Sequence, residues 1–137
     1  MDRRPGCAAM RDLPSGIALV ALGREASHGG GLPPDRERQL HLLATASAIA
    51  EREANAGDAP TREIEGWLRR FYERVETGGE DADIGQMLHR LAAQLRAGAF
   101  ERCAMRQRAA NAILWRLTIL KLREGNPQFL AANGFGE

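Results

Sequence analysis

The strongest constraint in the sequence is a dense apolar run near its C-terminal end. Seven of the ten side chains between positions 113 and 122 are large and apolar, namely Ile113, Leu114, Trp115, Leu117, Ile119, Leu120 and Leu122. A helix with one face in solvent needs only about three or four apolar residues in every two turns. We therefore expect a helix over 101–124 to be covered on most of its sides and to form the centre of a helical bundle.

Length and composition indicate one globular domain. The chain has 137 residues, of which 44% are hydrophobic and 27% are charged, and these values are ordinary for a single domain. Its net charge of +1 argues against a dedicated nucleic-acid binder, which usually carries a strongly basic stripe. No apolar run approaches the roughly 18 residues of a membrane-spanning helix, so we expect neither a nucleic-acid partner nor a membrane.

The basic residues and the cysteines suggest where the protein works. Lysine occurs only at Lys121 among 19 basic residues, and alanine and glycine are abundant, a composition typical of a GC-rich bacterial coding sequence. No small-residue cleavage site follows the apolar stretch 17–22, so the sequence does not predict a secretory signal peptide there. Cys7 and Cys103 lie far apart and imply no disulfide framework. We expect a cytoplasmic protein, and neither cysteine has an assigned role.

Glycine and proline divide the chain into helical segments. We expect one short N-terminal helix and four long helices, over 15–26, 35–55, 61–77, 83–97 and 101–124. Short connections favour antiparallel neighbours. The predicted fold is all-α, a single antiparallel five-helix bundle over 13–130, with a flexible N-terminal arm (1–12) and a flexible tail (131–137).

The apolar positions of the middle helices recur at helical spacing. In 61–77 and 83–97 they form clean amphipathic stripes that should be core, Ile64, Trp67, Leu68, Phe71 and Val75 in the first and Ile84, Met87, Leu88, Leu91 and Leu95 in the second. The helix 35–55 differs, because the face from Ala44 to Ala54 holds small residues. That face permits a close approach of another helix.

Groups for catalysis or metal binding do not come together in the sequence. His28, His41 and His89 form no His-x-x-x-His or Glu-x-x-His pair, so the pattern of a di-iron bundle is missing. Cys103 lies near a helix start, where the helix dipole lowers thiol pKa values, but a small packed residue is the simpler interpretation. We therefore predict no catalytic residue, no metal site, no cofactor and no enzymatic activity.

Arg116 interrupts the apolar run and needs a partner or a groove. Glu51 and Glu53 are plausible partners, since they end the small-residue helix. A structural ion pair is the simpler interpretation. The alternative is a cleft between helices 35–55 and 101–124 in which Arg116 recognises a ligand.

Two faces of the last long helix compete for the core. Ile113, Leu117 and Leu120 make one side and are the better candidates for the intramolecular core. Trp115, Ile119 and Leu122 share the other face. If that face is exposed, it forms an apolar patch of the kind that marks a partner surface; core packing is the alternative.

The end of this helix carries a short motif, Lys121-Leu122, a spacer, then Asn126-Pro127-Gln128-Phe129-Leu130. Together with the alanine-rich stretch 43–53, which ends in Glu51-Arg52-Glu53, and the turn 95–98, it resembles the bacterial domain-of-unknown-function family 6285. The resemblance covers roughly residues 13–130, and Lys121, Asn126, Pro127 and Phe129 carry its most recognisable part. The chain departs from the family pattern at Thr45 and in the more apolar stretch 115–120.

The resemblance implies a function in acyl-CoA metabolism, because members of that family tend to be encoded beside acyl-CoA dehydrogenases and aminoglycoside-phosphotransferase-like kinases. Two functions follow as predictions. The first is a non-catalytic accessory protein with a protein partner, such as one of those enzymes or a second copy in a homodimer. The alternative is a helical domain that binds an acyl or acyl-CoA ligand.

Overall fold

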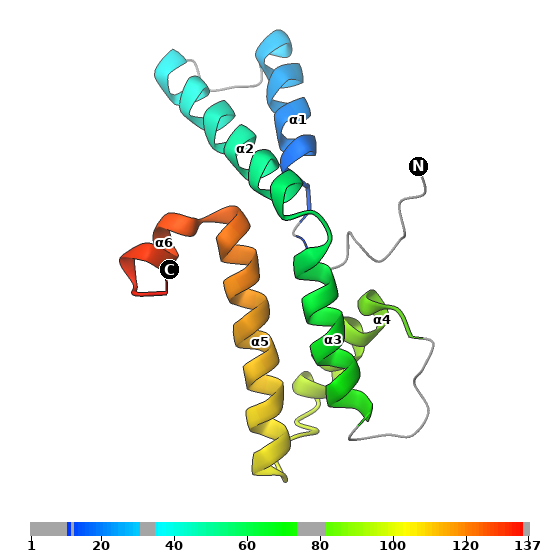
Figure 1. Cartoon of the computed structure of the whole chain (residues 1–137). Coiled ribbons are helices and arrows are strands. Elements are labelled where there is room, and N and C mark those ends of the chain that lie inside the picture. Colours follow the sequence, from blue (N-terminus) through cyan, green and yellow to red (C-terminus); the bar gives the residue numbers. More distant parts are fainter. Residues whose placement is uncertain (1–10, 12, 31–34, 74–81, 136–137) are drawn as a thin grey trace. The chain divides into compact units, whose positions relative to one another are not determined.

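The computed structural model describes Arg11 and residues 13–30, 35–73 and 82–135. All regular structure in these ranges is helical (Figure 1): α1 (Gly16–Gly29), α2 (Arg36–Ala56), α3 (Ala59–Glu73), α4 (Ile84–Arg96), α5 (Ala104–Gly125) and α6 (Pro127–Ala132). The all-α class predicted from the sequence is confirmed. The count of five helices is wrong, since the described ranges contain six.

The additional helix is α6, which follows the long helix after a single residue. Pro127 occupies the first turn, where its missing N–H removes no helical hydrogen bond. The side chain of Asn126 accepts a hydrogen bond from the Phe129 N–H at 3.2 Å, so the residue that ends α5 also starts α6. Leu130 is buried, as expected for a segment that folds back, and the predicted tail 131–137 begins inside this helix.

Contacts divide the chain into two compact units, where the sequence predicts one bundle domain over 13–130. Residues 12–57 form the first, here called the hairpin unit, and residues 58–137 with residues 1–11 form the second, here called the core unit. The hairpin unit contains α1 and α2, and the core unit contains α3 to α6. A single antiparallel bundle of all the helices stays a prediction.

The hairpin unit is two antiparallel helices in close contact (Figure 1). A Cβ added to Gly16 would lie 2.4 Å from the backbone nitrogen of Ala50, so the small-residue face of α2 does permit a close approach. The Gly16 N–H also donates to the Glu53 carboxylate at 2.9 Å. Ser15 and Asp35 cap the two helices by accepting hydrogen bonds from backbone N–H groups.

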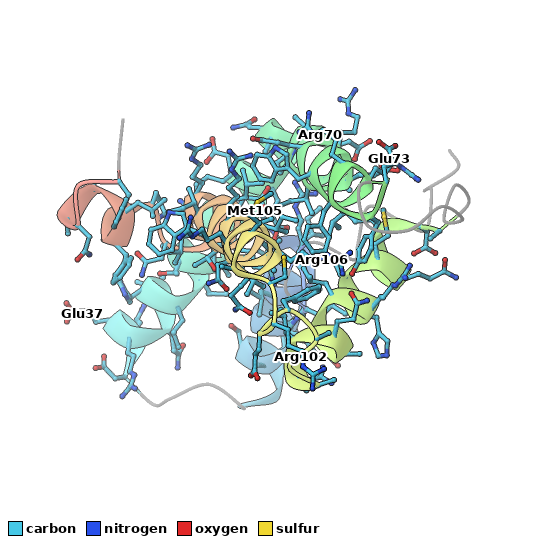
Figure 2. All side chains as sticks on the ribbon, turned by 90° about the horizontal axis from the view of Figure 1, so that it is seen from below. Glu37, Arg70, Glu73, Arg102, Met105 and Arg106 are labelled. Atoms are coloured by element: carbon cyan, nitrogen blue, oxygen red, sulfur yellow. The ribbon has the colours of Figure 1, made fainter. Side chains whose placement is uncertain are left out.

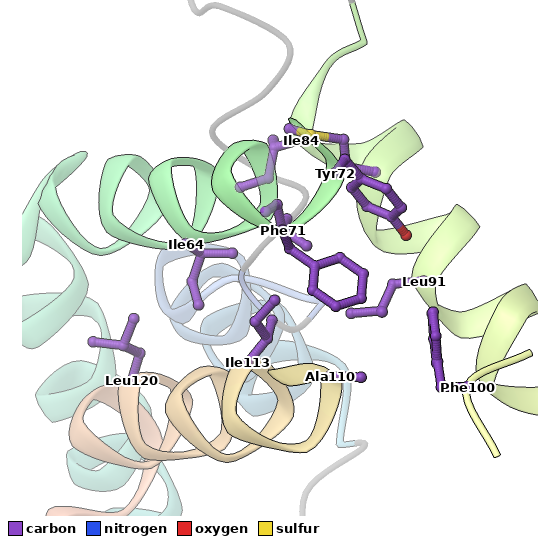
Figure 3. Close-up of a cluster of buried hydrophobic side chains, with 11 residues drawn as sticks. Ile64, Phe71, Tyr72, Ile84, Leu91, Phe100, Ala110, Ile113 and Leu120 are labelled. Carbon is purple, nitrogen blue, oxygen red and sulfur yellow. The ribbon is translucent and has the colours of Figure 1, made fainter. Parts of the chain in front are cut away.

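The core unit contains a hydrophobic cluster built by three helices and one turn (Figure 3). Its members are Ile64, Leu68, Phe71 and Tyr72 of α3, Ile84, Met87 and Leu91 of α4, Phe100, and Ala110, Ile113 and Leu120 of α5. The amphipathic stripes predicted a large part of this cluster; Val75 lies outside the described residues. Phe71 is central, because its ring makes edge-to-face contacts with Tyr72 and Phe100.

α5 is covered along one stripe instead of on most sides. The cluster takes Ile113 and Leu120, with Leu117 packed against it, as the choice of core face predicted. Leu114 and Trp115 remain 38% and 53% exposed, so the expectation of near-complete covering is wrong. With the partly buried Leu117, the buried positions Ala110, Ile113, Leu120 and Glu124 follow one another at three or four residues, which places them on one side of the helix.

Candidate functional site

An open groove runs between α3 and the first half of α5 within the core unit. It has a volume of about 600 Å³ and is lined by Trp67, Arg70, Phe71, Cys103, Met105, Arg106, Ala109, Ala112, Ile113 and Arg116. The α5 residues fall at helical spacing on the side next to its buried stripe. We call this feature the α3–α5 groove; sequence reasoning did not predict it.

Arg116 lies against an aromatic ring in this groove. Its guanidinium carbon is 4.2 Å from the centroid of the Trp67 ring, which is a cation–π contact. The ring and the arginine come from neighbouring antiparallel helices, α3 and α5 (Figure 1). The apolar run tolerates this arginine because its charged end reaches the groove edge, where the side chain is exposed.

The predicted partners of Arg116 belong to the other unit. Glu51 and Glu53 are on α2 in the hairpin unit, where Glu53 accepts the hydrogen bond from Gly16. The ion pair with Arg116, and the cleft between α2 and α5, would each join the two units. Both stay predictions.

The charge of the groove has one sign. Arg70, Arg106 and Arg116 contribute guanidinium groups, and none of the described residues that line the groove carries a carboxylate. Arg70 and Met105 lie toward the end of the unit where α3 stops and α5 starts (Figure 2). Glu73, one turn after Arg70 on α3, does not line the groove. The chain as a whole carries only +1, so this local excess is not a consequence of composition.

The candidate interface residues lie on the side of α5 away from its buried stripe. Trp115 is 53% exposed and meets the Phe135 ring edge to face, with centroids 5.3 Å apart. Ile119 and Leu122 share this face by helical spacing and are half-buried. We call the surface of Trp115, Ile119, Leu122 and Phe135 the Trp115 face. Phe135 could not be assigned to this face from the sequence, since no helical spacing connects it to Trp115.

The motif residues that resemble family 6285 have local structural roles. Asn126 and Pro127 start α6, as described above, and Phe129 is 49% exposed. Lys121 is half-buried on the α4 side of α5, beside Leu114 and Leu117. The motif is therefore the junction of two helices, and its conformation alone does not indicate a chemical activity.

An ion pair that sequence reasoning missed lies at the end of α5. Arg11 donates to both carboxylate oxygens of Glu124, at 2.7 and 2.9 Å, and both side chains are largely buried. The pair joins residues 113 positions apart in the sequence. The one available signal was Glu124 itself, which continues the buried stripe of Ile113, Leu117 and Leu120 at helical spacing.

The described residues bring together no group for metal chemistry. Nowhere in these ranges do three or more His, Cys, Asp or Glu side chains gather as metal ligands. His28, His41 and His89 are all exposed. Cys103 is an exposed free thiol at the start of α5 and makes no side-chain capping bond there, while Cys7 lies outside the described residues.

Comparison with known proteins adds no relative: no family model, no curated protein and no solved structure matches this chain. The resemblance to family 6285 therefore stays a prediction. Within the described ranges, every helix is too short or too polar to cross a membrane.

Proposed function

We propose that this chain is a non-catalytic accessory protein that works by binding a protein partner through the Trp115 face. The observation that carries the proposal is the half-exposed Trp115 on the side of α5 that the core leaves uncovered. A contiguous exposed apolar patch marks interaction surfaces, and tryptophan is enriched among the residues that dominate binding energy at interfaces.

The contact with Phe135 prepares this face for binding. An edge-to-face pair of rings holds Trp115 in one orientation, so less side-chain entropy is lost when a partner covers it. Ile119 and Leu122 extend the apolar surface along the helix by one and two further turns. This is the arrangement of a helix that presents apolar anchors to a groove or to another helix.

The resemblance supplies the identity of the proposed partner. An acyl-CoA dehydrogenase or a phosphotransferase-like kinase is the expected partner, which would connect the protein to acyl-CoA metabolism in the bacterial cytoplasm. A second copy of the chain is the other candidate, through the same face. The alternative function is binding of an acyl or acyl-CoA ligand, and the α3–α5 groove in the core unit favours it.

The test is affinity capture from the native cell with two matched variants. Trp115→Ser should abolish co-purification of the dehydrogenase or the kinase, identified by mass spectrometry. Leu40→Ser, at a site 59% exposed in the hairpin unit, should leave it intact. Capture of neither enzyme, or equal capture by both variants, would refute the heteromeric proposal.

Sedimentation of the pure protein distinguishes the homodimer. If the partner is a second copy, the chain should sediment as a dimer at high micromolar concentration, and Trp115→Ser should make it a monomer. A monomeric native chain removes that form of the proposal.

A further inference from the structure

The α3–α5 groove has the size and shape of a site for a small elongated ligand. Its volume of about 600 Å³ is within the roughly 300–1,000 Å³ typical of ligand pockets. On α5 it extends from Met105 to Arg116, a distance of about 16 Å at 1.5 Å per residue. A chain-like molecule fits this length, whereas a compact ion would leave most of the groove empty.

The groove wall is apolar where an apolar chain would lie. Trp67, Phe71, Met105 and Ile113 line it together with two alanines. Phe71 and Ile113 are buried members of the core cluster and form a fixed base, while Met105 is 79% exposed and supplies adaptable surface. Covering Met105 and Trp67 removes apolar area from water, which favours binding by about 25 cal/mol for each Å².

The guanidinium groups on this groove are unpaired within the part of the chain that the structure describes. Among the residues that the structure describes, no carboxylate pairs with Arg70, Arg106 or Arg116. Arginine binds carboxylates through two parallel N–H···O bonds. Positive charge on an apolar groove is complementary to a molecule with an apolar body and a single negative group.

Arg116 is the arginine best placed to hold that negative group. Its guanidinium rests on the Trp67 ring, and stacking restrains the side chain while the N–H groups at the edge of its plane remain able to donate. Arg70 and Arg106 are exposed like Arg116, but neither lies against a ring of the described residues. They add attraction at longer range, which salt screens.

From these observations we propose that the α3–α5 groove binds a soluble amphipathic carboxylate. The apolar chain lies on Trp67, Phe71, Met105 and Ile113, and Arg116 holds the carboxylate. The inference does not depend on the protein partner proposed above, because the two sites use different sides of α5.

Tryptophan fluorescence can report on this groove alone. The chain has two tryptophans, so Trp115→Phe leaves Trp67 in the groove as the sole reporter, and Trp67→Phe leaves Trp115 as a control outside it. Decanoate below its micelle concentration should give a saturable change with the Trp67 reporter and none with the Trp115 reporter. An equal change in both, or none in either, would overturn the proposal.

The charge requirement is tested with matched ligands. Decanol has the same chain without the charge and should bind at least about tenfold more weakly, since one charge-assisted bidentate contact is worth about 1.4 kcal/mol or more. Decyl phosphate should bind like decanoate if the arginines recognise any anionic head. Equal binding of decanol and decanoate would contradict the assigned role of the arginines.

Arginine variants locate the head group. Arg116→Gln should weaken decanoate binding about tenfold, and Arg106→Gln only about two- to threefold, with that smaller loss vanishing at high salt. Arg108→Gln removes an exposed arginine of α5 that does not line the groove and should have no effect. Equal losses in Arg116→Gln and Arg108→Gln would overturn the assignment.

Cys103 gives a second readout that needs no tryptophan. This exposed thiol lines the groove, so in a Cys7→Ser background bound decanoate should slow its alkylation by iodoacetamide.

A membrane is the competing source of apolar chains that carry an anionic group. Binding to vesicles of anionic phospholipid, with no protection of Cys103 by monomeric decanoate, would replace the soluble ligand by a lipid surface and overturn the proposal.

Discussion

The hairpin unit and the core unit use apolar residues in different ways. In the core unit, α3, α4 and α5 and the turn that holds Phe100 together bury eleven apolar side chains in one cluster. In the described part of the hairpin unit, Gly16 is the one residue that is fully buried, and Ile17, Leu22, Leu40 and Leu42 are 45–64% exposed. The difference shows that apolar content does not make a core without a third element to close it.

The two units are therefore stabilised by different interactions. A pair of helices covers one stripe on each member, so α1 and α2 depend on backbone contact at Gly16, the hydrogen bond to Glu53 and their caps. Each cap contributes about 1 kcal/mol. The core unit relies on burial, which contributes more for each residue. The free energy of local opening should therefore be larger in the core unit than in the hairpin unit.

The largest expected effect comes from truncating a buried leucine. Leu68 is 0% exposed in the core cluster, so Leu68→Ala should cost about 3 kcal/mol in the free energy of unfolding, from lost burial and from the cavity. Leu40→Ala in the hairpin unit, where the side chain is 59% exposed, should change it by less than about 0.5 kcal/mol. Urea unfolding measures both, and similar losses at the two sites would refute the contrast.

Two glycine variants test how the hairpin unit is held. In Gly16→Ala the new Cβ meets the α2 backbone at 2.4 Å, and such overpacking costs about 1–3 kcal/mol. Gly66→Ala is the matched control in the core unit, because a Cβ there has nothing within 4 Å, and it should stabilise α3 by about 1 kcal/mol.

Amide hydrogen exchange shows where these changes act. Gly16→Ala should lower protection in α1 and α2 and leave α3 and α5 unchanged, if the two units open independently. Equal loss of protection in both units would mean that they unfold together, and the comparison between them would fail.

The third prediction concerns the ion pair at the end of α5. Glu124→Gln removes the charge that faces the largely buried Arg11 and should lower the stability of the core unit by about 2 kcal/mol. Exchange protection in the hairpin unit should not change. In a double-mutant cycle with Arg11→Gln the two losses should be less than additive; additive losses would show that the pair contributes no coupling.

Helical spacing and breakers carried most of the fold prediction. They predicted the class, the core stripes of α3 and α4, and Ile113 and Leu120 as the buried side of α5, while the exposure of Trp115 was left open between an interface and the core. They gave the wrong number of helices, because a six-residue helix such as α6 has too few positions to show a period. Apolar density overestimated the covering of α5, since density does not say how many neighbours a helix will have.

The candidate site was harder to predict than the fold. Trp115, Ile119 and Leu122 could be grouped because one helix carries all three. The α3–α5 groove could not, because it needs the register between two helices that are distant in the sequence. The sequence indicated that Arg116 needs a partner or a groove, and the structure places it over Trp67, which the helical stripe assigned to the core and which does pack against the core cluster.

The smallest expected effect is a loss of stability at alkaline pH, confined to the core unit. Tyr72 is the one tyrosine of the chain; its hydroxyl donates to Gln94 at 2.8 Å, and the Arg90 guanidinium lies 4.6 Å from its ring centroid. Burial raises the pKa of Tyr72 above its ordinary value of 10.0, and the Arg90 charge partly opposes this rise. Above pH 10.0 the native state then holds a proton that the unfolded state releases, so stability falls as the pH rises through the folded-state pKa.

The phenolate absorbance of the folded chain measures that pKa directly, since no other side chain here is a phenol. It should titrate above 10.0 while the far-ultraviolet circular dichroism is still native. In Tyr72→Phe the loss of stability at high pH that comes from Tyr72 should be absent from α3 and α4. The free energy of unfolding at neutral pH should nevertheless be lower in this variant. Exchange protection in the hairpin unit, which contains no tyrosine, should not follow the same titration. A phenol that titrates at or below 10.0 in the folded chain would show that Tyr72 is not desolvated, and that this edge of the core is open to water.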